Sequence, residues 1–428
     1  MIKKMLTLFS NKFDFIKNYK IVLFIIIILL AFFKSPFIFL NGRFVAEEGS
    51  HWFYYSYLNG PVSGLFQIYT ENGYFNLWPN IASAFATFVP LEISPYVTVY
   101  FAFLVKVYLF LFIIFQNSIF LKTNFEKFIA ALIVLVAPPM VAEVWLNTLT
   151  SQVYFTLIVL MIFFQTNTNN FFSKSSSVVL FISTLSSITS CIFAPFFLIK
   201  YIKEKNKLNF LNLFSVFVGS FIQTCIFIII RINNLESIGE TYRYNISLEK
   251  ILSFLYNGVY KSFLGRDLTQ SIYFSIENFL HFNLIIISSF VIFFLFIIVF
   301  FKKIIDNKVL IYLIIFFIIQ SFLAIYASKG MQVQGRYALI PGILLIFIVL
   351  KLREVDNFII KWISSILITL SIITGLYEYK HKNKYPHFLT CINCPVWKEE
   401  VKKWRKDNSY ELKIWDYPRK TMKLIKDN

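Results

Sequence analysis

Charged residues are scarce in this chain: Asp, Glu, Lys and Arg make up 15% of its 428 residues. A soluble domain needs about 25% to cover its surface, so a soluble enzyme is excluded. Glycine (13) and proline (12) are also few, which excludes collagen-like and disordered chains, and four cysteines exclude a disulfide scaffold. Hydrophobic residues are abundant, at 57%, and the mean hydropathy is +0.66. The composition therefore predicts a polytopic membrane protein.

The net charge of +18 comes from 41 Lys and Arg against 23 Asp and Glu. Cations at the ends of membrane spans need no partner other than lipid headgroups. The sequence shows no soluble segment in which a basic helix is interleaved with stacking aromatic residues. We therefore expect membrane lipid, and no nucleic acid, as a partner.

Long apolar runs define the predicted fold. A bilayer core of about 30 Å needs about 20 apolar residues per helix, and about eleven runs approach this requirement. They lie near residues 21–40, 97–117, 128–145, 152–166, 177–188, 190–202, 208–230, 282–301, 309–327, 337–350 and 358–377. The short pair around Ser186 to Pro195 is also compatible with a re-entrant hairpin. We predict an all-α transmembrane bundle over residues 1–377 and a small extramembrane tail over residues 378–428.

Basic residues predict the orientation. Five lysines precede the first run, which places the N-terminus in the cytoplasm, and we expect Lys34 within that run to reach the outer interface. Alternate counting then places the short basic loops on one side, as the positive-inside bias requires. The opposite side receives the loops near residues 41–96, 143–152, 232–280 and 328–336, and also the tail. Short interfacial helices are expected in the first of these loops.

The first external loop begins with Arg43-Phe-Val-Ala-Glu-Glu-Gly-Ser-His-Trp. Glu47 and Glu48 are adjacent, and partial desolvation at the membrane boundary would raise the pKa of at least one, which suits a catalytic base. A solvated acidic pair that caps a helix is the other interpretation. The four histidines lack metal-ligand spacing, and we single out His51 because it lies beside the pair.

Tyr74 and Trp78 stand in the sequence TENGYFNLWPN of the same loop. Aromatic residues broken by Gly and Pro indicate short interfacial helices, and they could form a platform for a sugar. An aromatic belt that anchors the protein at the interface uses the same residue types. Both interpretations stay open for these two side chains.

Arg336 lies in the sequence Gln334-Gly-Arg-Tyr337, just before a late apolar run. An arginine at the mouth of a helix can donate two parallel hydrogen bonds to a phosphate, and the neighbouring glycines allow a close approach of the backbone. A simple interfacial arginine is the alternative. Asn147 belongs to another polar loop on the same side, where it can contact a substrate or only turn the chain.

Topology places the acidic pair and Arg336 at the same leaflet. A general base together with a phosphate clamp is what sugar transfer from a polyprenyl phosphate requires. In the tail, Cys391 and Cys394 form a CxxC pair, which fits a disulfide in a small cap. Zinc would need two more ligands, and His381 and His387 do not have the usual spacing.

The combined segments AEEGSHWF, TENGYFNLWPN, VPLE-I-SP and QGRYALIP, with a Trp-rich tail, resemble bacterial membrane proteins of the GT-C glycosyltransferase superfamily. The resemblance covers the span layout and short motifs. It implies transfer of a sugar from a polyprenyl-phosphate carrier to a glycan acceptor, on the external face of the bacterial inner membrane. It also implies Glu47 and Glu48 as catalytic residues and Arg336 as a phosphate contact. Glu-Glu replaces the Asp-containing pair of many members, so the acting carboxylate and the use of a divalent metal stay open.

Two other functions fit the same features. A flippase or transporter of a lipid-linked glycan would bind the phosphate without breaking a bond, but the sequence lacks the internal repeats typical of transporters. An O-antigen ligase or polymerase would transfer a whole glycan. The sequence does not identify the sugar.

Overall fold

The computed structural model describes residues 19–70, 73–166, 170–233, 245–275, 306–328, 330, 332–333, 335–380, 395–415 and 420–424. The described part is mostly helical, as predicted. Its one sheet is a two-stranded ladder in the tail, in which β1 (Leu412–Lys413) pairs antiparallel with β2 (Thr421–Met422).

Five helices in the described part are long and apolar enough to cross a membrane. They are α6 (Ser94–Phe115) with the short η3 (Leu91–Ile93) before it, α12 (Lys207–Ile232), α16 (Lys308–Ala327), α17 (Gly335–Leu352) and α18 (Phe358–Lys380). The helix over residues 19–34 and the shorter α8 (Gln152–Phe163) and α9 (Phe171–Ser186) also lie in predicted runs. The run at 282–301 lies outside the described residues, and the number of eleven spans stays a prediction.

The run predicted at 128–145 gives a shorter helix, α7 (Asn124–Val136). Its start is fixed by a capping box, in which the Thr123 hydroxyl accepts from the Glu126 N–H and the Glu126 side chain accepts from the Thr123 N–H. It ends early because Pro138 and Pro139 disfavour helix in the preceding residues. The chain then continues through the short η4 (Ala142–Val144) and η5 (Leu149–Ser151) to α8.

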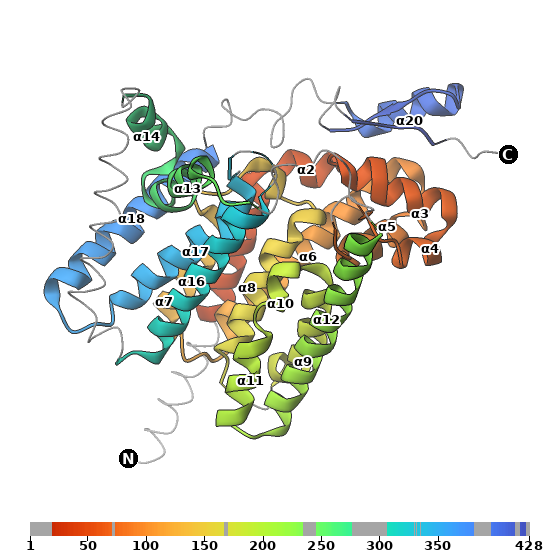
Figure 1. The fold of residues 1–428 in the computed structure, drawn as a ribbon. Coiled ribbons are helices and arrows are strands. Elements are labelled where there is room, and N and C mark those ends of the chain that lie inside the picture. The colour runs from red at the N-terminus through yellow and green to blue at the C-terminus, as the bar shows by residue number, and fades with distance from the viewer. Residues whose placement is uncertain are drawn as a thin grey trace, which may run out of the picture.

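Residues 171–203 form a helical hairpin, an arrangement that fits both two short spans and a re-entrant segment. It consists of α9, the one-turn α10 (Ile188–Cys191) and α11 (Ala194–Lys203). Asn170, just before α9, donates to the side chain of Gln116 at 2.6 Å, and Lys200 in α11 donates to the carbonyl of Gln165 at 3.2 Å. Gln116 and Gln165 lie at the same end of the bundle. The Gln116 side chain donates to the carbonyl of Thr166, the residue after Gln165, at 3.4 Å. Both arms therefore start and finish at one end, with α10 between them inside the bundle (Figure 1).

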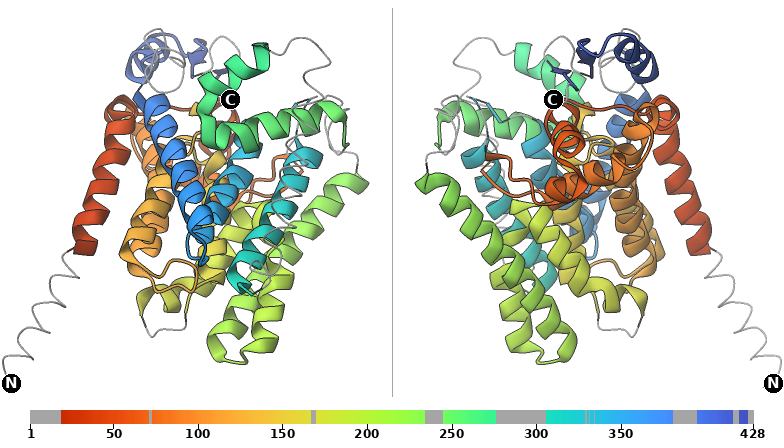
Figure 2. Two further views of the ribbon diagram at one scale, coloured as in Figure 1. Left: turned by 90° about the vertical axis from the view of Figure 1, so that its left-hand side faces the viewer. Right: turned by 90° about the vertical axis from the view of Figure 1, so that its right-hand side faces the viewer.

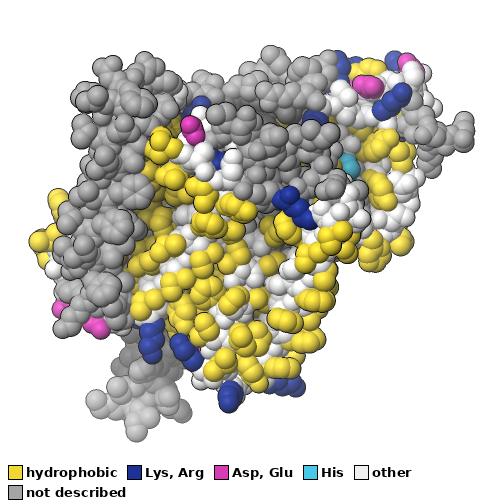
Figure 3. Space-filling view, in the orientation of Figure 1, with side chains coloured by type: hydrophobic (Ala, Val, Ile, Leu, Met, Phe, Trp, Pro, Cys, Tyr) yellow, Lys and Arg dark blue, Asp and Glu magenta, His cyan; other side chains and the backbone are white. Residues whose placement is uncertain are grey.

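The two ends of the bundle differ in chemistry. We call one the loop end: it carries α2 (Pro36–Asn41), η1 (Glu48–Phe53), α3 (Tyr54–Asn59), α4 (Pro61–Leu65), α5 (Leu77–Ala86), α13 (Leu248–Phe254), η7 (Leu255–Tyr260), α14 (Lys261–Ser275) and the tail helix α20 (Trp397–Lys406) (Figures 1 and 2). We call the other the basic end, where exposed cations such as Lys174, Lys203 and Lys207 gather. Figure 3 shows Lys and Arg side chains along this edge, below a broad apolar surface.

The tail packs on the first loop. The Trp397 indole N–H donates to the Leu91 carbonyl at 2.6 Å, and Arg405 pairs with Glu92 at 2.8 Å. The tail and the first loop thus share one end of the bundle, which agrees with the predicted topology. Cys391, Cys394, His381 and His387 lie outside the described residues.

The prediction that Lys34 reaches the outer interface is wrong. Its side chain is only 6% exposed, and its ammonium donates to the Leu135 carbonyl at 2.8 Å and lies 4.4 Å from the centre of the Trp145 ring. A carbonyl and an aromatic face inside the bundle replace water around the charge, so the side chain has no need to extend outward.

Candidate functional site

A cavity of about 510 Å³ opens at the loop end between segments that are distant in the sequence. Its walls come from the first loop, the 143–153 segment, α10, α12, α16 and α17. Its charged lining residues among those described are Glu47, Glu143 and Arg336, and its uncharged polar ones are Tyr74, Asn147, Thr150, Gln152, Thr189, Gln223, Thr224, Gln320, Tyr326 and Tyr337. Two carboxylates, a guanidinium and many hydrogen-bonding groups therefore face one space.

Glu47 and Arg336, paired by topology in the sequence analysis, line this same cavity. Arg336 forms a long ion pair with Glu143, 3.5 Å between Nη1 and Oε1, and also interacts electrostatically with Glu47. The side chains of Arg336 and Glu143 are about one-third exposed, at 35% and 30%. A long, partly hydrated pair is weak, so an anion entering the cavity can replace Glu143 as the partner of Arg336.

The two adjacent glutamates point in different directions. Glu47 lines the cavity, whereas Glu48 is 0% exposed and lies in the protein interior. The Glu48 Oε1 atom accepts from the Thr148 backbone N–H at 2.9 Å and from the Thr148 hydroxyl at 2.5 Å. Burial raises the pKa of Glu48, although the Thr148 hydrogen bonds and the charge of Arg43 act in the opposite direction. Glu48 therefore connects the first loop to the 143–153 segment, and Glu47 is the carboxylate that a ligand can reach.

A strained backbone conformation just before the two glutamates directs their side chains to different sides. Ala46 has a φ of +47°, in the left-handed region that a residue with a Cβ rarely adopts. Its N–H donates to the Trp415 carbonyl of the tail at 3.2 Å. Directly after this bend, Glu48 begins the π-helical η1, and π-helical turns occur often at functional sites. The bend and the π-turn together fix which glutamate faces the cavity.

Trp145 anchors the segment opposite the first loop. Its carbonyl accepts from the Arg43 guanidinium at 2.6 Å, and the ammonium of Lys106 lies 5.2 Å from its ring centre and 4.1 Å from that of Tyr154. Lys34 lies over the same indole. Cations over aromatic faces gain electrostatic stabilisation when they are removed from water. This buried cluster holds the two segments that carry Glu47 and Glu143 close together.

Gly335 allows α17 to begin next to the 137–141 segment. A Cβ at this position would lie 2.4 Å from Val141 Cγ1 and 3.3 Å from the Pro139 carbonyl oxygen. Only glycine leaves room for this approach. The contact places Arg336 beside Glu143 at the wall of the cavity.

The polar groups at the base of the cavity were missed in the sequence. Gln320 in α16 donates to the Thr189 carbonyl at 3.3 Å. Gln223 in α12 donates to the carbonyls of Phe75, at 2.7 Å, and Leu185, at 3.0 Å, and accepts from the Phe75 N–H at 3.2 Å. Single amides within apolar runs leave the hydropathy of a span almost unchanged, so a hydropathy pattern does not distinguish them.

The other predicted site residues fall into three groups. Tyr74 and Tyr337 line the cavity, as does Asn147, and the Tyr74 hydroxyl donates to Gln152 at 3.4 Å. His51 stacks on Tyr69 with ring centres 3.9 Å apart, and Trp78 packs against Phe101 and Phe155, so neither is among the lining residues. Gln334 lies outside the described residues.

Each carboxylate of the cavity lies beside a cation. Glu143 pairs with Arg336, and Glu47 pairs with Lys420. In the part of the chain that the structure describes, no three His, Cys, Asp or Glu side chains are grouped so that they could hold a metal ion.

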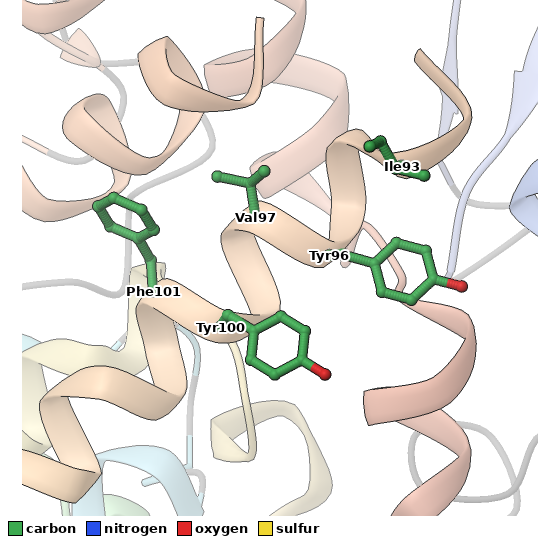
Figure 4. A pocket seen from close by; sticks show the side chains of 5 residues that line it. All are labelled: Ile93, Tyr96, Val97, Tyr100 and Phe101. Atoms are coloured by element: carbon green, nitrogen blue, oxygen red, sulfur yellow. The ribbon is translucent and has the colours of Figure 1, made fainter. Parts of the chain in front are cut away.

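A second hollow, of about 450 Å³, lies on the outer surface of α6 (Figure 4). Its lining consists of Ile93, Tyr96, Val97, Tyr100 and Phe101. The hydroxyls of Tyr96 and Tyr100 donate to carbonyls in α2, at 2.8 Å and 3.4 Å, so the hollow presents hydrocarbon and ring faces. It has nearly the volume of the first cavity but no group for acid–base chemistry.

A comparison with known protein families, characterised proteins and solved structures finds no match to this chain. The functional argument therefore rests on the side chains of the loop-end cavity.

Proposed function

We propose that the protein is a membrane glycosyltransferase of the GT-C type, which moves a sugar from a polyprenyl-phosphate carrier to a hydroxyl of a cell-surface glycan or lipid-linked intermediate. The observation that supports this proposal is the placement of Glu47 and Arg336 in one cavity. In the proposed topology, about eleven spans cross the bacterial inner membrane, with the basic end in the cytoplasm and the loop end outside.

Arg336 would bind the phosphate that joins the sugar to the lipid. Its guanidinium can form two parallel hydrogen bonds to phosphate oxygens, and its present partner Glu143 is held only at 3.5 Å. Apolar lining residues, including Phe227, Leu323 and Ile340, offer a surface for the first part of the lipid chain. The uncharged amides of Gln152 and Gln320 provide donors and acceptors for sugar hydroxyls.

Glu47 would act as the general base. It accepts the proton of an acceptor hydroxyl as that oxygen attacks the anomeric carbon, and the bond from this carbon to the phosphate oxygen breaks. Arg336 stabilises the charge that develops on the departing phosphate. Attack from the face opposite the leaving group inverts the anomeric configuration. Glu48 has no direct part in this scheme because its carboxylate is buried against Thr148.

A flippase for a lipid-linked glycan is the main alternative. Ionisable residues inside spans are typical of transport pathways, and Lys106 in α6 is fully buried. Its ammonium, however, lies over Trp145 and Tyr154, and Lys106 is not among the residues that line the cavity. This placement favours an anchoring role for Lys106 over a role in translocation.

Vesicles that contain the purified protein and a polyprenyl-phosphate hexose with a radiolabelled sugar separate the alternatives. Label that moves onto an acceptor extract supports transfer, and the size of the product distinguishes one sugar from a whole glycan. Label that only crosses the bilayer, still bonded to the carrier, would overturn the proposal in favour of a flippase. Vesicles with Glu47→Gln protein serve as the matched control.

A further inference from the structure

The tail does more than cover the first loop, because it pairs with the backbone that precedes Glu47. The Trp415 N–H donates to the Phe44 carbonyl at 3.1 Å, and the Trp415 carbonyl accepts from the Ala46 N–H at 3.2 Å. The Trp415 ring lies under the Arg43 guanidinium, at 4.7 Å. The strained bend at Ala46 is thus held by a segment from the opposite terminus of the chain.

A shared hydrophobic cluster fixes this arrangement. The first loop contributes Phe44 and Phe53, and their rings stack with centres 4.6 Å apart. The tail contributes Trp397, Val401, Leu412, Ile414, Met422 and Leu424, all of them buried. Burial of this many apolar side chains makes the tail an integral part of the loop end and not an attached appendage.

One charged side chain of the tail reaches the cavity residue itself. Lys420 Nζ lies 3.3 Å from Glu47 Oε1, and the two side chains are 38% and 37% exposed. Lys420 stands immediately before β2. Met422 in β2 and the following Leu424 are buried in the shared cluster and anchor the backbone next to Lys420. Among the described residues, the charged groups that share this cavity with Glu47 are Arg336 from α17 and its partner Glu143.

We infer that Lys420 is a positioning residue for the proposed base: through its ion pair it holds the Glu47 carboxylate at the cavity wall. This inference rests on the proposed function of Glu47. The C-terminal tail thereby contributes one residue, Lys420, to the proposed site.

A zero-length cross-link tests the contact without any measurement of activity. A water-soluble carbodiimide activates a carboxylate, and an amine in contact with it displaces the activated oxygen to leave an amide. Mass spectrometry of digested, detergent-solubilised protein should find a 47–420 cross-link in the wild type and none in Lys420→Met. The matched control is the exposed pair of Lys122 and Glu354 at the basic end, 3.2 Å apart, which should cross-link in both proteins.

Kinetics then test the positioning role. Lys420→Met should lower kcat for sugar transfer about 2–5-fold, as expected for loss of a partly exposed ion pair, and should leave the KM for the lipid-linked donor unchanged. Lys420→Arg should restore most of the activity. Lys423→Met is the control, because it removes one positive charge from an exposed lysine in the same segment of the tail. The unfolding midpoint of all three variants should match that of the wild type.

The results of these experiments distinguish a failure of the proposed role of Lys420 from a failure of the proposed glycosyltransferase function. A wild-type protein that transfers sugar but gives no 47–420 cross-link overturns the role of Lys420 and leaves the glycosyltransferase intact. A Lys420→Met variant whose kcat matches that of Lys423→Met does the same. A cross-linked wild-type protein that transfers no sugar overturns the proposed function, and with it any role of Lys420 in catalysis.

Discussion

The basic end and the loop end use charged residues in opposite ways. At the basic end, Lys127 donates to the Gln116 carbonyl at 2.7 Å and Lys200 to the Phe163 carbonyl at 2.6 Å, so these cations satisfy carbonyls at the ends of helices. Glu126 there caps a helix. At the loop end, Glu47, Glu143 and Arg336 come from three distant segments and face a cavity. Charges of the first kind help to fold and orient the protein, and charges of the second kind are available to a ligand.

The largest expected effect is at Glu47. Glu47→Gln removes the proposed base and should lower kcat for sugar transfer by about 10²–10⁴-fold, while the unfolding midpoint stays unchanged. Glu354→Gln at the basic end removes a carboxylate whose partners are Lys122 and Lys351. It should keep transfer within about twofold of wild type, because Glu354 is not among the residues that line the cavity. Radiolabel transfer in vesicles measures both. Equal transfer activity of Glu47→Gln and Glu354→Gln would contradict the claim that the carboxylate at the loop end acts in the reaction and the one at the basic end does not.

The next largest effect is at Arg336. Arg336→Lys keeps the charge but loses the two parallel hydrogen bonds to phosphate, so we expect a loss of about 10–100-fold in kcat/KM. Arg353→Lys is the basic-end control, since Arg353 lies 5.3 Å over the Phe125 ring, far from the cavity lining. Steady-state kinetics with varied donor concentration measure the effect. Full activity of Arg336→Lys would argue against a bidentate phosphate contact.

A moderate effect on stability is expected at Thr148. Thr148→Val removes a hydroxyl that donates to the buried Glu48 carboxylate and should cost about 1–3 kcal/mol of unfolding free energy. Thr166→Val at the basic end, where the hydroxyl donates to the Asn117 carbonyl in an exposed position, should change this free energy by about 0.5 kcal/mol or less. Denaturant unfolding in detergent compares the two. Similar losses for both variants would show that Glu48 is not a specific link between loop segments.

The smallest effect is the pH dependence contributed by Glu48. Because burial raises the pKa of Glu48 above the ordinary value of a glutamate, the folded state disfavours ionisation. This group therefore lowers stability as pH rises from the ordinary pKa toward the raised one. Glu48→Gln removes this dependence, so its stability relative to wild type should increase from acidic toward neutral pH. Unfolding midpoints across this range measure the difference. A constant difference at every pH would mean that Glu48 titrates as it does in the unfolded chain.

The sequence predicted the helical bundle well because hydropathy depends on local composition. The runs that give α6, α12, α16, α17 and α18 are apolar over enough residues to cross a bilayer, whatever their neighbours. Proline also explains the early end of α7, a boundary that was placed too late. The number of spans stays a prediction, since several helices in the described part are short.

The site was predicted only in part, since its geometry depends on distant contacts. Topology placed Glu47 and Arg336 at one leaflet, but the choice between Glu47 and Glu48 depends on the bend at Ala46 and on Trp415 in the tail. Lys34 was misplaced because its carbonyl and indole partners lie about a hundred residues away in the chain. No local pattern contains such information.

The most direct test of the account is the fate of a radiolabelled sugar on a polyprenyl phosphate in vesicles with wild-type or Glu47→Gln protein. The account predicts that wild-type protein moves the label to a new acceptor and that Glu47→Gln protein does not, although both fold and both bind the polyprenyl phosphate. Equal transfer by the two proteins, or label that stays on its carrier with wild-type protein, would contradict the claim that Glu47 and Arg336 act together on one lipid-linked sugar.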